Sequence, residues 1–186
     1  MSEVTLTVAT AAQMRALGRS LATLLRAGDL VILSGGLGAG KTTLTQGIGD
    51  GLGVRGPITS PTFVIARVHP PVGQAGTVPA TTGRLRPALV HADAYRLGSV
   101  LELDDLDLDT DTAASVTVVE WGEGLAEGLA DDRLEIAITA GAPLNSQEAG
   151  DSDDTVADAP RTVRISAVGE RWEGIKLPLL SPSHRL

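Results

Sequence analysis

The chain has 186 residues, of which 42% are hydrophobic and 20% charged, which favours a single folded domain over residues 1–186. Fifteen basic against twenty-three acidic residues leave a net charge of −8, which argues against direct binding of nucleic acid. The absence of cysteine excludes disulfides and thiolate metal sites, and no apolar run reaches membrane-spanning length. Because no signal peptide is expected either, we predict a cytoplasmic protein without membrane association.

In chain order, the apolar pattern predicts alternating strands and helices. In residues 4–8 apolar side chains alternate with threonines, which predicts a strand. Thr10 and Gln13 have the spacing of a capping box at the start of a helix. Apolar residues then recur every four positions after residue 44, which predicts a second helix. Further strands are predicted over residues 30–33, 64–68, 88–92, 116–119, 133–139 and 161–168, and a short helix over residues 122–130. This order predicts an α/β fold with a mixed, largely parallel central sheet.

Four segments are predicted to lie outside this regular framework. Residues 69–87 are rich in proline, glycine and threonine between two strands, which indicates a long flexible hairpin loop. Residues 140–160 hold five acidic residues and no basic one, which is typical of a disordered connection. Residues 169–186 are expected to form a loosely docked tail, and the acidic stretch 102–111 is interpreted as short surface turns.

A glycine-rich stretch follows the strand predicted at residues 30–33. Residues 35–42 read Gly-Gly-Leu-Gly-Ala-Gly-Lys-Thr and fit the phosphate-binding motif G-x-x-x-x-G-K-[ST]. Glycines let backbone amides turn inward around an anion, and the following helix directs its positive end to the same place. Lys41 would reach the β- and γ-phosphates and Thr42 would offer a hydroxyl to Mg²⁺. A chance glycine turn is the alternative, but the motif has its required context, which predicts a P-loop NTPase-like three-layer sandwich.

Nucleotide hydrolysis also needs a carboxylate near the metal and a group that positions water. Two predicted strands end at Asp93 and Glu120, and either carboxylate taken alone could equally be a surface turn residue. Thr62 belongs to a Ser-Pro-Thr segment that could act as a switch, although its spacing alone favours an ordinary proline turn. His91 shares a strand face with Asp93 and is as plausibly packed as catalytic. Arg96 fits a surface salt bridge better than a phosphate contact.

Taken in order, these motifs resemble one family. The phosphate loop, Ser-Pro-Thr-Phe, His-Ala-Asp-Ala-Tyr-Arg and Val-Glu-Trp are similar to segments of the bacterial TsaE (YjeE) ATPases of the tRNA threonylcarbamoyladenosine pathway. The resemblance implies a Mg²⁺-dependent ATP hydrolase that is weak by itself and acts with the TsaB–TsaD complex. That complex modifies the adenosine next to the anticodon, so tRNA would be reached only indirectly, through these partner proteins.

The resemblance also implies roles for individual residues. Lys41 would hold phosphate, Thr42 and Glu120 would ligate Mg²⁺, Asp93 would support hydrolysis, and Thr62 would belong to a mobile switch. Trp121 would lie near the nucleotide or the partner, while Met14 and Gly36 stand where the family often has threonine and aspartate. The residues implied to bind ATP are Thr10, Ala11, Gly36, Leu37, Gly38, Ala39, Gly40, Lys41, Thr42 and Thr43.

Two other classes of function remain open at this point. A small-molecule kinase would use the same phosphate loop, but the chain lacks an obvious arginine-rich lid. A regulatory GTPase would carry an N-K-x-D motif that reads guanine, and the one asparagine of the chain, Asn145, lies in the acidic loop. Transfer of phosphate to an acceptor, or tighter binding of GDP than ADP, would support these alternatives.

Overall fold

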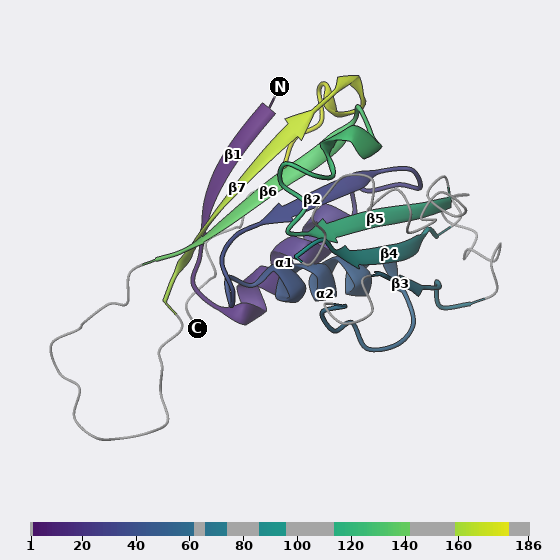
Figure 1. The fold of residues 1–186 in the computed structure, drawn as a ribbon, viewed down its shortest axis with the longest axis horizontal. Coiled ribbons are helices and arrows are strands. Elements are labelled where there is room, and N and C mark those ends of the chain that lie inside the picture. Colours follow the sequence, from purple (N-terminus) through teal and green to yellow (C-terminus); the bar gives the residue numbers. More distant parts are fainter. Residues whose placement is uncertain (1, 62–65, 74–85, 96–113, 142–158, 179–186) are drawn as a thin grey trace, which may run out of the picture.

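The computed structural model describes residues 2–61, 66–73, 86–95, 114–141 and 159–178, which form one seven-stranded sheet with α-helices against it (Figure 1). None of the helices in these residues is long and apolar enough to cross a lipid bilayer. The regular elements are β1 (Ser2–Val8), α1 (Ala11–Ala22), β2 (Leu30–Ser34), α2 (Lys41–Leu52), β3 (Ala66–His69), β4 (Ala88–Asp93), β5 (Ser115–Glu120), the 3₁₀ turn η3 (Glu127–Leu129), β6 (Arg133–Ala140), β7 (Arg161–Val168) and the 3₁₀ turn η4 (Glu170–Trp172).

The strand order is β1-β7-β6-β2-β5-β4-β3. The parallel pairs are β2 with β5, β2 with β6 and β4 with β5, whereas β7 and β3 run opposite to the other five strands. This confirms the predicted α/β fold with a mixed, largely parallel sheet. Because β2, β4 and β5 are parallel neighbours, their carboxyl ends meet at one edge of the sheet, where ligands bind in folds of this kind.

Both α-helices pack on the same face of the sheet and against each other (Figure 1). Two glycines allow their close approach, because a Cβ on Gly18 would clash with the carbonyl oxygen of Leu44 and one on Gly47 with that of Arg15. The predicted N-cap is confirmed, since Thr10 Oγ1 accepts from the amide of Gln13. Gln13 Oε1 accepts from the amide of Ala9 and not from that of Thr10, so the return bond of the predicted capping box is displaced by one residue. Apolar residues from both helices and from six strands form one buried core on this face.

The opposite face of β2, β4 and β5 is covered by residues 122–130. The predicted helix over these residues is wrong: the segment forms turns, with the three-residue η3 as its regular part. Gly124 adopts a φ of 79°, which an α-helix cannot accommodate, and two further glycines weaken helix formation. Ala126 nevertheless packs in a small second core beneath this cover with Leu30, Ile32, Ala92, Ala94 and Val119.

Residues 169–178 are packed more firmly than the expected loose tail. The indole of Trp172 is buried with 2% of its surface exposed, and Ile175 and Leu177 pack against the main core. Arg171 forms a two-pronged ion pair with buried Asp29, with nitrogen–oxygen distances of 3.0 and 3.2 Å. These apolar and ionic contacts join the end of the described chain to the turn before β2. Residues 179–186, most of the loops at 69–87 and 140–160, and the acidic stretch 102–111 lie outside the described residues.

Candidate phosphate and metal site

The glycine-rich loop connects β2 to α2 at the carboxyl edge of the sheet. Gly35, Gly38 and Gly40 have φ angles of 140°, 72° and 110°, which other residues rarely adopt. Gly40 is the N-cap of α2 and has no side chain to cap the first amides of the helix, so these amides depend on other groups for hydrogen bonds. This backbone can surround an anion at the positive end of a helix.

Lys41 lies at the centre of this loop. Its ammonium donates to the carbonyl oxygens of Gly35 and Gly36 at 2.7 and 3.0 Å, and it sits 3.6 Å from the ring centroid of Trp121. Trp121 has a φ of 60°, a conformation that is costly for a non-glycine residue and that accompanies this placement of its indole against the lysine. Burial lowers the pKa of Lys41, while the charges of Glu120 and Asp93 oppose that shift. The loop therefore holds a buried amine next to two carboxylates.

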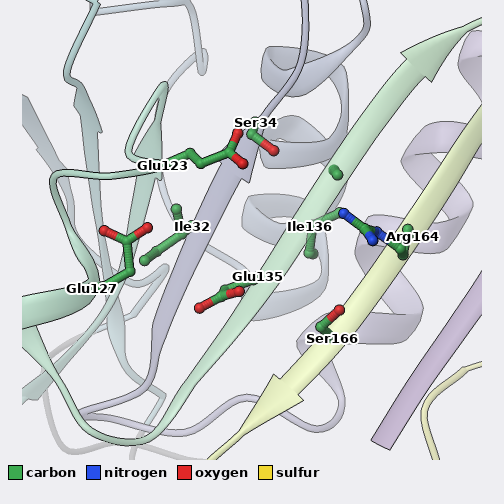
Figure 2. Close-up of a pocket in the computed structure, with 9 residues that line it drawn as sticks. Ile32, Ser34, Glu123, Glu127, Glu135, Ile136, Arg164 and Ser166 are labelled. Carbon is green, nitrogen blue, oxygen red and sulfur yellow. The ribbon is translucent and has the colours of Figure 1, made fainter.

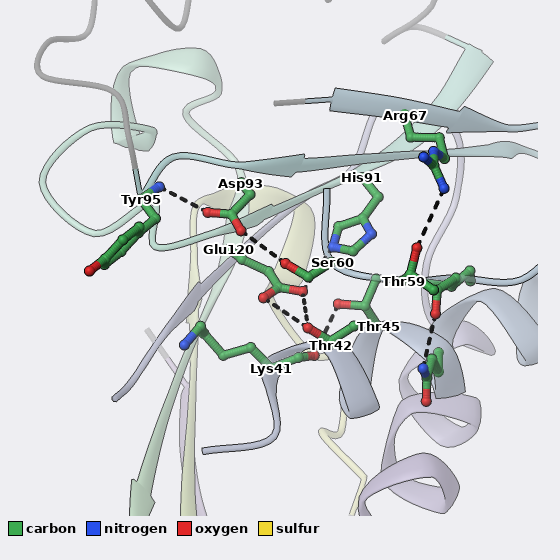
Figure 3. A network of polar contacts seen from close by, with 12 residues as sticks. Lys41, Thr42, Thr45, Thr59, Ser60, Arg67, His91, Asp93, Tyr95 and Glu120 are labelled. Carbon is green, nitrogen blue, oxygen red and sulfur yellow. Dashed lines mark hydrogen bonds and ion pairs between the residues drawn. The ribbon is translucent and has the colours of Figure 1, made fainter. Parts of the chain in front are cut away.

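Both strand-end carboxylates point toward the loop (Figure 3). Thr42 Oγ1 lies 2.9 and 3.1 Å from the two carboxylate oxygens of Glu120, at the end of β5. Asp93 ends the adjacent strand β4 in register with Glu120 and accepts bonds from Ser60 Oγ at 3.1 Å and from the amide of Tyr95 at 2.9 Å. The sequence left open whether these carboxylates lie on the surface. In the structure both are buried, with 3% of Asp93 and 2% of Glu120 exposed.

The donor set at this point suits Mg²⁺. A hydroxyl and carboxylates are hard oxygen ligands, and Thr42 can give its one hydrogen to Glu120 while its lone pairs stay available for a cation. The described residues contain no group of three or more histidines, cysteines, aspartates and glutamates that could hold a metal ion by themselves. Mg²⁺ typically takes one or two protein ligands and completes its shell with water and phosphate oxygens, and Thr42 and Glu120 are the residues here that could supply them.

A cavity of about 190 Å³ adjoins the phosphate loop on the side of α1. It brings two residues implied by the resemblance, Thr10 and Ala11, next to Gly38, Gly40 and Thr43 of the loop region. Its remaining lining residues are Met14 and Arg161. Sequence reasoning missed Arg161 because the residue reaches the loop only through the pairing of β7 with β6, and no local motif marks it. Thr62 and Arg96 lie outside the described residues, so their predicted roles stay predictions.

A second, smaller cavity of about 50 Å³ lies on the other face of the sheet, in front of β2, β6 and β7 (Figure 2). Glu123, Glu127 and Glu135 line it together with Arg164. Its volume suits one or two water molecules, and three carboxylates would repel a triphosphate. We therefore assign the candidate nucleotide site to the glycine loop.

Comparison with known proteins gives a consistent result. The family model described as threonylcarbamoyl adenosine biosynthesis protein TsaE matches residues 8–148, a range that contains the loop, Asp93 and Glu120. A Streptomyces coelicolor protein named tRNA threonylcarbamoyladenosine biosynthesis protein TsaE is 53% identical over 169 residues, which cover 90% of this chain and 99% of that protein. A Bacillus subtilis protein of the same name is 33% identical and covers 87% of this chain and 84% of its own length. The crystal structure of Bacillus subtilis YdiB matches with a TM-score of 0.64 and 26% identity, over 92% of this chain and 90% of that one.

Proposed function

Because this chain belongs to the TsaE family, we propose that it is a Mg²⁺-dependent ATP hydrolase in the biosynthesis of threonylcarbamoyladenosine in tRNA. The observation that carries the proposal is the bond from Thr42 Oγ1 to the carboxylate of Glu120 at 2.9 Å. It joins the helix that follows the phosphate loop to a strand-end carboxylate. A phosphate loop with such a partner is the arrangement that nucleotide triphosphatases use to hold phosphate and metal together.

The residues divide the work as follows. Loop amides from residue 36 onward would bind the phosphates, and the Lys41 ammonium would exchange its carbonyl partners for phosphate oxygens, which it binds more strongly because they carry charge. Thr42 and Glu120 would hold Mg²⁺, which when bound neutralises charge on the β- and γ-phosphate oxygens. Asp93, held by Ser60 and Tyr95, would orient the attacking water. The cavity beside Thr10 would receive the nucleoside.

We further propose that the TsaB–TsaD complex is the partner and that the protein works in the cytoplasm. Two apolar side chains flank the site, Leu37 with 95% and Tyr95 with 62% of their surface exposed, which suits a mouth that another protein covers. The net charge of −8 disfavours direct contact with tRNA phosphates, so the tRNA would be bound by the partner complex.

The test compares ATP turnover in the presence of TsaB and TsaD for the wild type, Lys41→Ala and Glu120→Ala. We expect both substitutions to lower turnover by about 100-fold or more, since each removes a charge that the transition state uses. Lys176→Ala is the matched control, because it replaces the one other lysine of the chain, which is exposed. Equal turnover in all four proteins would overturn the proposal. Phosphorus NMR of the products distinguishes release of inorganic phosphate from transfer to an acceptor, the small-molecule kinase alternative.

A further inference from the structure

We propose that His91 is a positioning residue of the metal site, which holds the Glu120 carboxylate in the orientation that serves Mg²⁺. This inference rests on the proposed function and deepens it, because it assigns a task to a side chain that does not itself reach the nucleotide. It starts from the contacts of one buried imidazole with its neighbours.

The sheet register places His91 beside Glu120. His91 pairs with Val118 between the parallel strands β4 and β5, and Asp93 pairs with Glu120 two residues further on, so His91 and Glu120 are diagonal neighbours on one face. The His91 ring is 0% exposed, and its Nε2 lies 2.8 Å from Glu120 Oε1. Figure 3 shows His91 and Thr42 on either side of the Glu120 carboxylate, and both contact its Oε1.

The direction of this bond follows from the chemistry of its two partners. An ionised carboxylate can only accept, so the imidazole hydrogen lies on Nε2 and His91 is the donor. Thr42 Oγ1 donates to the same carboxylate. His91 and Thr42, from two different elements, lie 2.8 and 2.9 Å from Oε1, and Thr42 also lies 3.1 Å from Oε2. Together they restrict the orientation of the carboxylate, and since Thr42 has one hydroxyl hydrogen to share, lone pairs of Oε2 can still serve a cation. Groups that orient a metal ligand in this way commonly determine how tightly the metal binds.

The other ring nitrogen supports a specific role for the Nε2 bond. His91 Nδ1 is buried and has no hydrogen-bond partner among the described residues. A residue kept only to fill this space would be apolar, since an unpaired buried nitrogen lowers stability. The bond to Glu120 accounts for a histidine at this position.

A second buried histidine provides a matched control. His69 on β3 is 3% exposed, and its Nε2 also finds no partner in the part of the chain that the structure describes, but its Nδ1 faces the carbonyl oxygen of Arg55 at 3.4 Å. His69→Phe therefore removes an equally buried imidazole from the same sheet without removing a donor to Glu120.

The experiment measures binding of ADP to the full chain, first without Mg²⁺ and then at rising Mg²⁺ concentration. In the wild type we expect Mg²⁺ to change the affinity for ADP. For His91→Phe, the Mg²⁺ concentration that gives half of this change should rise about tenfold or more, while the ADP affinity without Mg²⁺ should stay within about twofold of the wild-type value. His91→Gln, whose amide nitrogen can occupy the place of Nε2, should restore most of the wild-type response to Mg²⁺. His69→Phe should respond to Mg²⁺ as the wild type does.

The possible failures are distinguishable. If Mg²⁺ does not affect nucleotide binding even in the wild type, both the proposed function and this inference are overturned. If the wild type responds to Mg²⁺ and His91→Phe responds equally, only the inference is overturned and His91 has a packing role. Should His91→Phe not fold, His91→Asn replaces it, because its shorter amide sits at the place of Nδ1. An Asn variant that matches His91→Gln in its Mg²⁺ response would also overturn the inference.

Discussion

Thr42 and Glu120 are separated by 78 residues in the sequence, yet the threonine hydroxyl contacts both oxygens of the carboxylate, at 2.9 and 3.1 Å. The first comes from the start of α2 and the second from the end of β5, and β2, which leads into the loop, is the parallel neighbour of β5. The contact is thus a direct product of strand order. It places a hydroxyl and a carboxylate beside the glycine loop, the two groups to which the proposed function assigns Mg²⁺.

Removal of the Thr42 hydroxyl should weaken use of the metal rather than stability. Thr42→Val keeps the shape of the side chain, and we expect it to raise the Mg²⁺ concentration needed for half-maximal ATP turnover by about tenfold. Thr42→Ser retains the hydroxyl and is the control, with an expected change of less than about threefold. A Mg²⁺ titration of ATPase activity checks this, and a valine variant with the wild-type Mg²⁺ requirement would contradict it.

His69 should make the protein less stable in mild acid. Burial is the main cause that lowers the pKa of His69 from its usual 6.5, and the bond to Arg55 opposes it only in part. Between the folded pKa and 6.5 the unfolded chain therefore binds more protons, so stability decreases as pH falls through this window. His69→Phe should remove this part of the pH dependence, as measured by urea unfolding between about pH 5 and pH 7.5. Parallel stability profiles for the wild type and the variant would show that His69 does not contribute.

The Arg171–Asp29 pair should contribute far more to stability than ion pairs on the surface. Asp29 is 5% exposed, and its other ion-pair partner, Arg26, lies 3.8 Å away with a side chain that is 53% exposed. Arg171→Leu would therefore leave the buried carboxylate poorly compensated and should lower the free energy of unfolding by about 3 kcal/mol. The surface pair of Arg19 and Asp50, 3.7 Å apart with side chains 49% and 58% exposed, provides the control. Arg19→Leu should change stability by less than about 1 kcal/mol. Urea unfolding of both variants tests this contrast. Equal decreases in the free energy of unfolding for Arg171→Leu and Arg19→Leu would refute it.

The glycines at the crossing of α1 and α2 should not tolerate even a methyl group. In an ordinary helix, replacement of a glycine by alanine raises the free energy of unfolding by about 1 kcal/mol. Gly47→Ala should instead lower the free energy of unfolding by about 1–3 kcal/mol, because its Cβ would meet the backbone of Arg15 and force the helices apart. Gly128→Ala, whose added Cβ meets nothing within 4 Å, is the control and should be close to neutral. Thermal unfolding measures both, and a stabilised Gly47→Ala would disprove the close packing.

The local features of this protein could be predicted from sequence because each has a local physical cause. The N-cap at Thr10, the glycine loop and the strand ends at Asp93 and Glu120 all follow from neighbouring residues. The prediction of a helix over residues 122–130 was wrong because the apolar pattern does not indicate that Gly124 adopts a positive φ. The family was also recognisable, since several short motifs occur in its order along the chain.

The relationships between distant residues could not be predicted in the same way. The bond between His91 and Glu120, the approach of Arg161 to the loop and the Arg171–Asp29 pair, 142 residues apart, all depend on which strands are neighbours. Apolar periodicity identifies strands but does not give their order in the sheet. An arginine that forms a buried pair also has the same local sequence signal as one in solvent.

The position of β1 has a consequence for synthesis of the chain. Among the strands that the structure describes, β1 is at the edge of the sheet and pairs with β7 alone, so that Ser2 lies opposite Ala167. During synthesis β1 therefore waits for β7, which follows it much later in the chain, while β2 can already pair with β5. We expect the part of the sheet that holds the glycine loop to form before β1 is paired, and release of a chain truncated before β7 would leave an open β1 strand prone to aggregation.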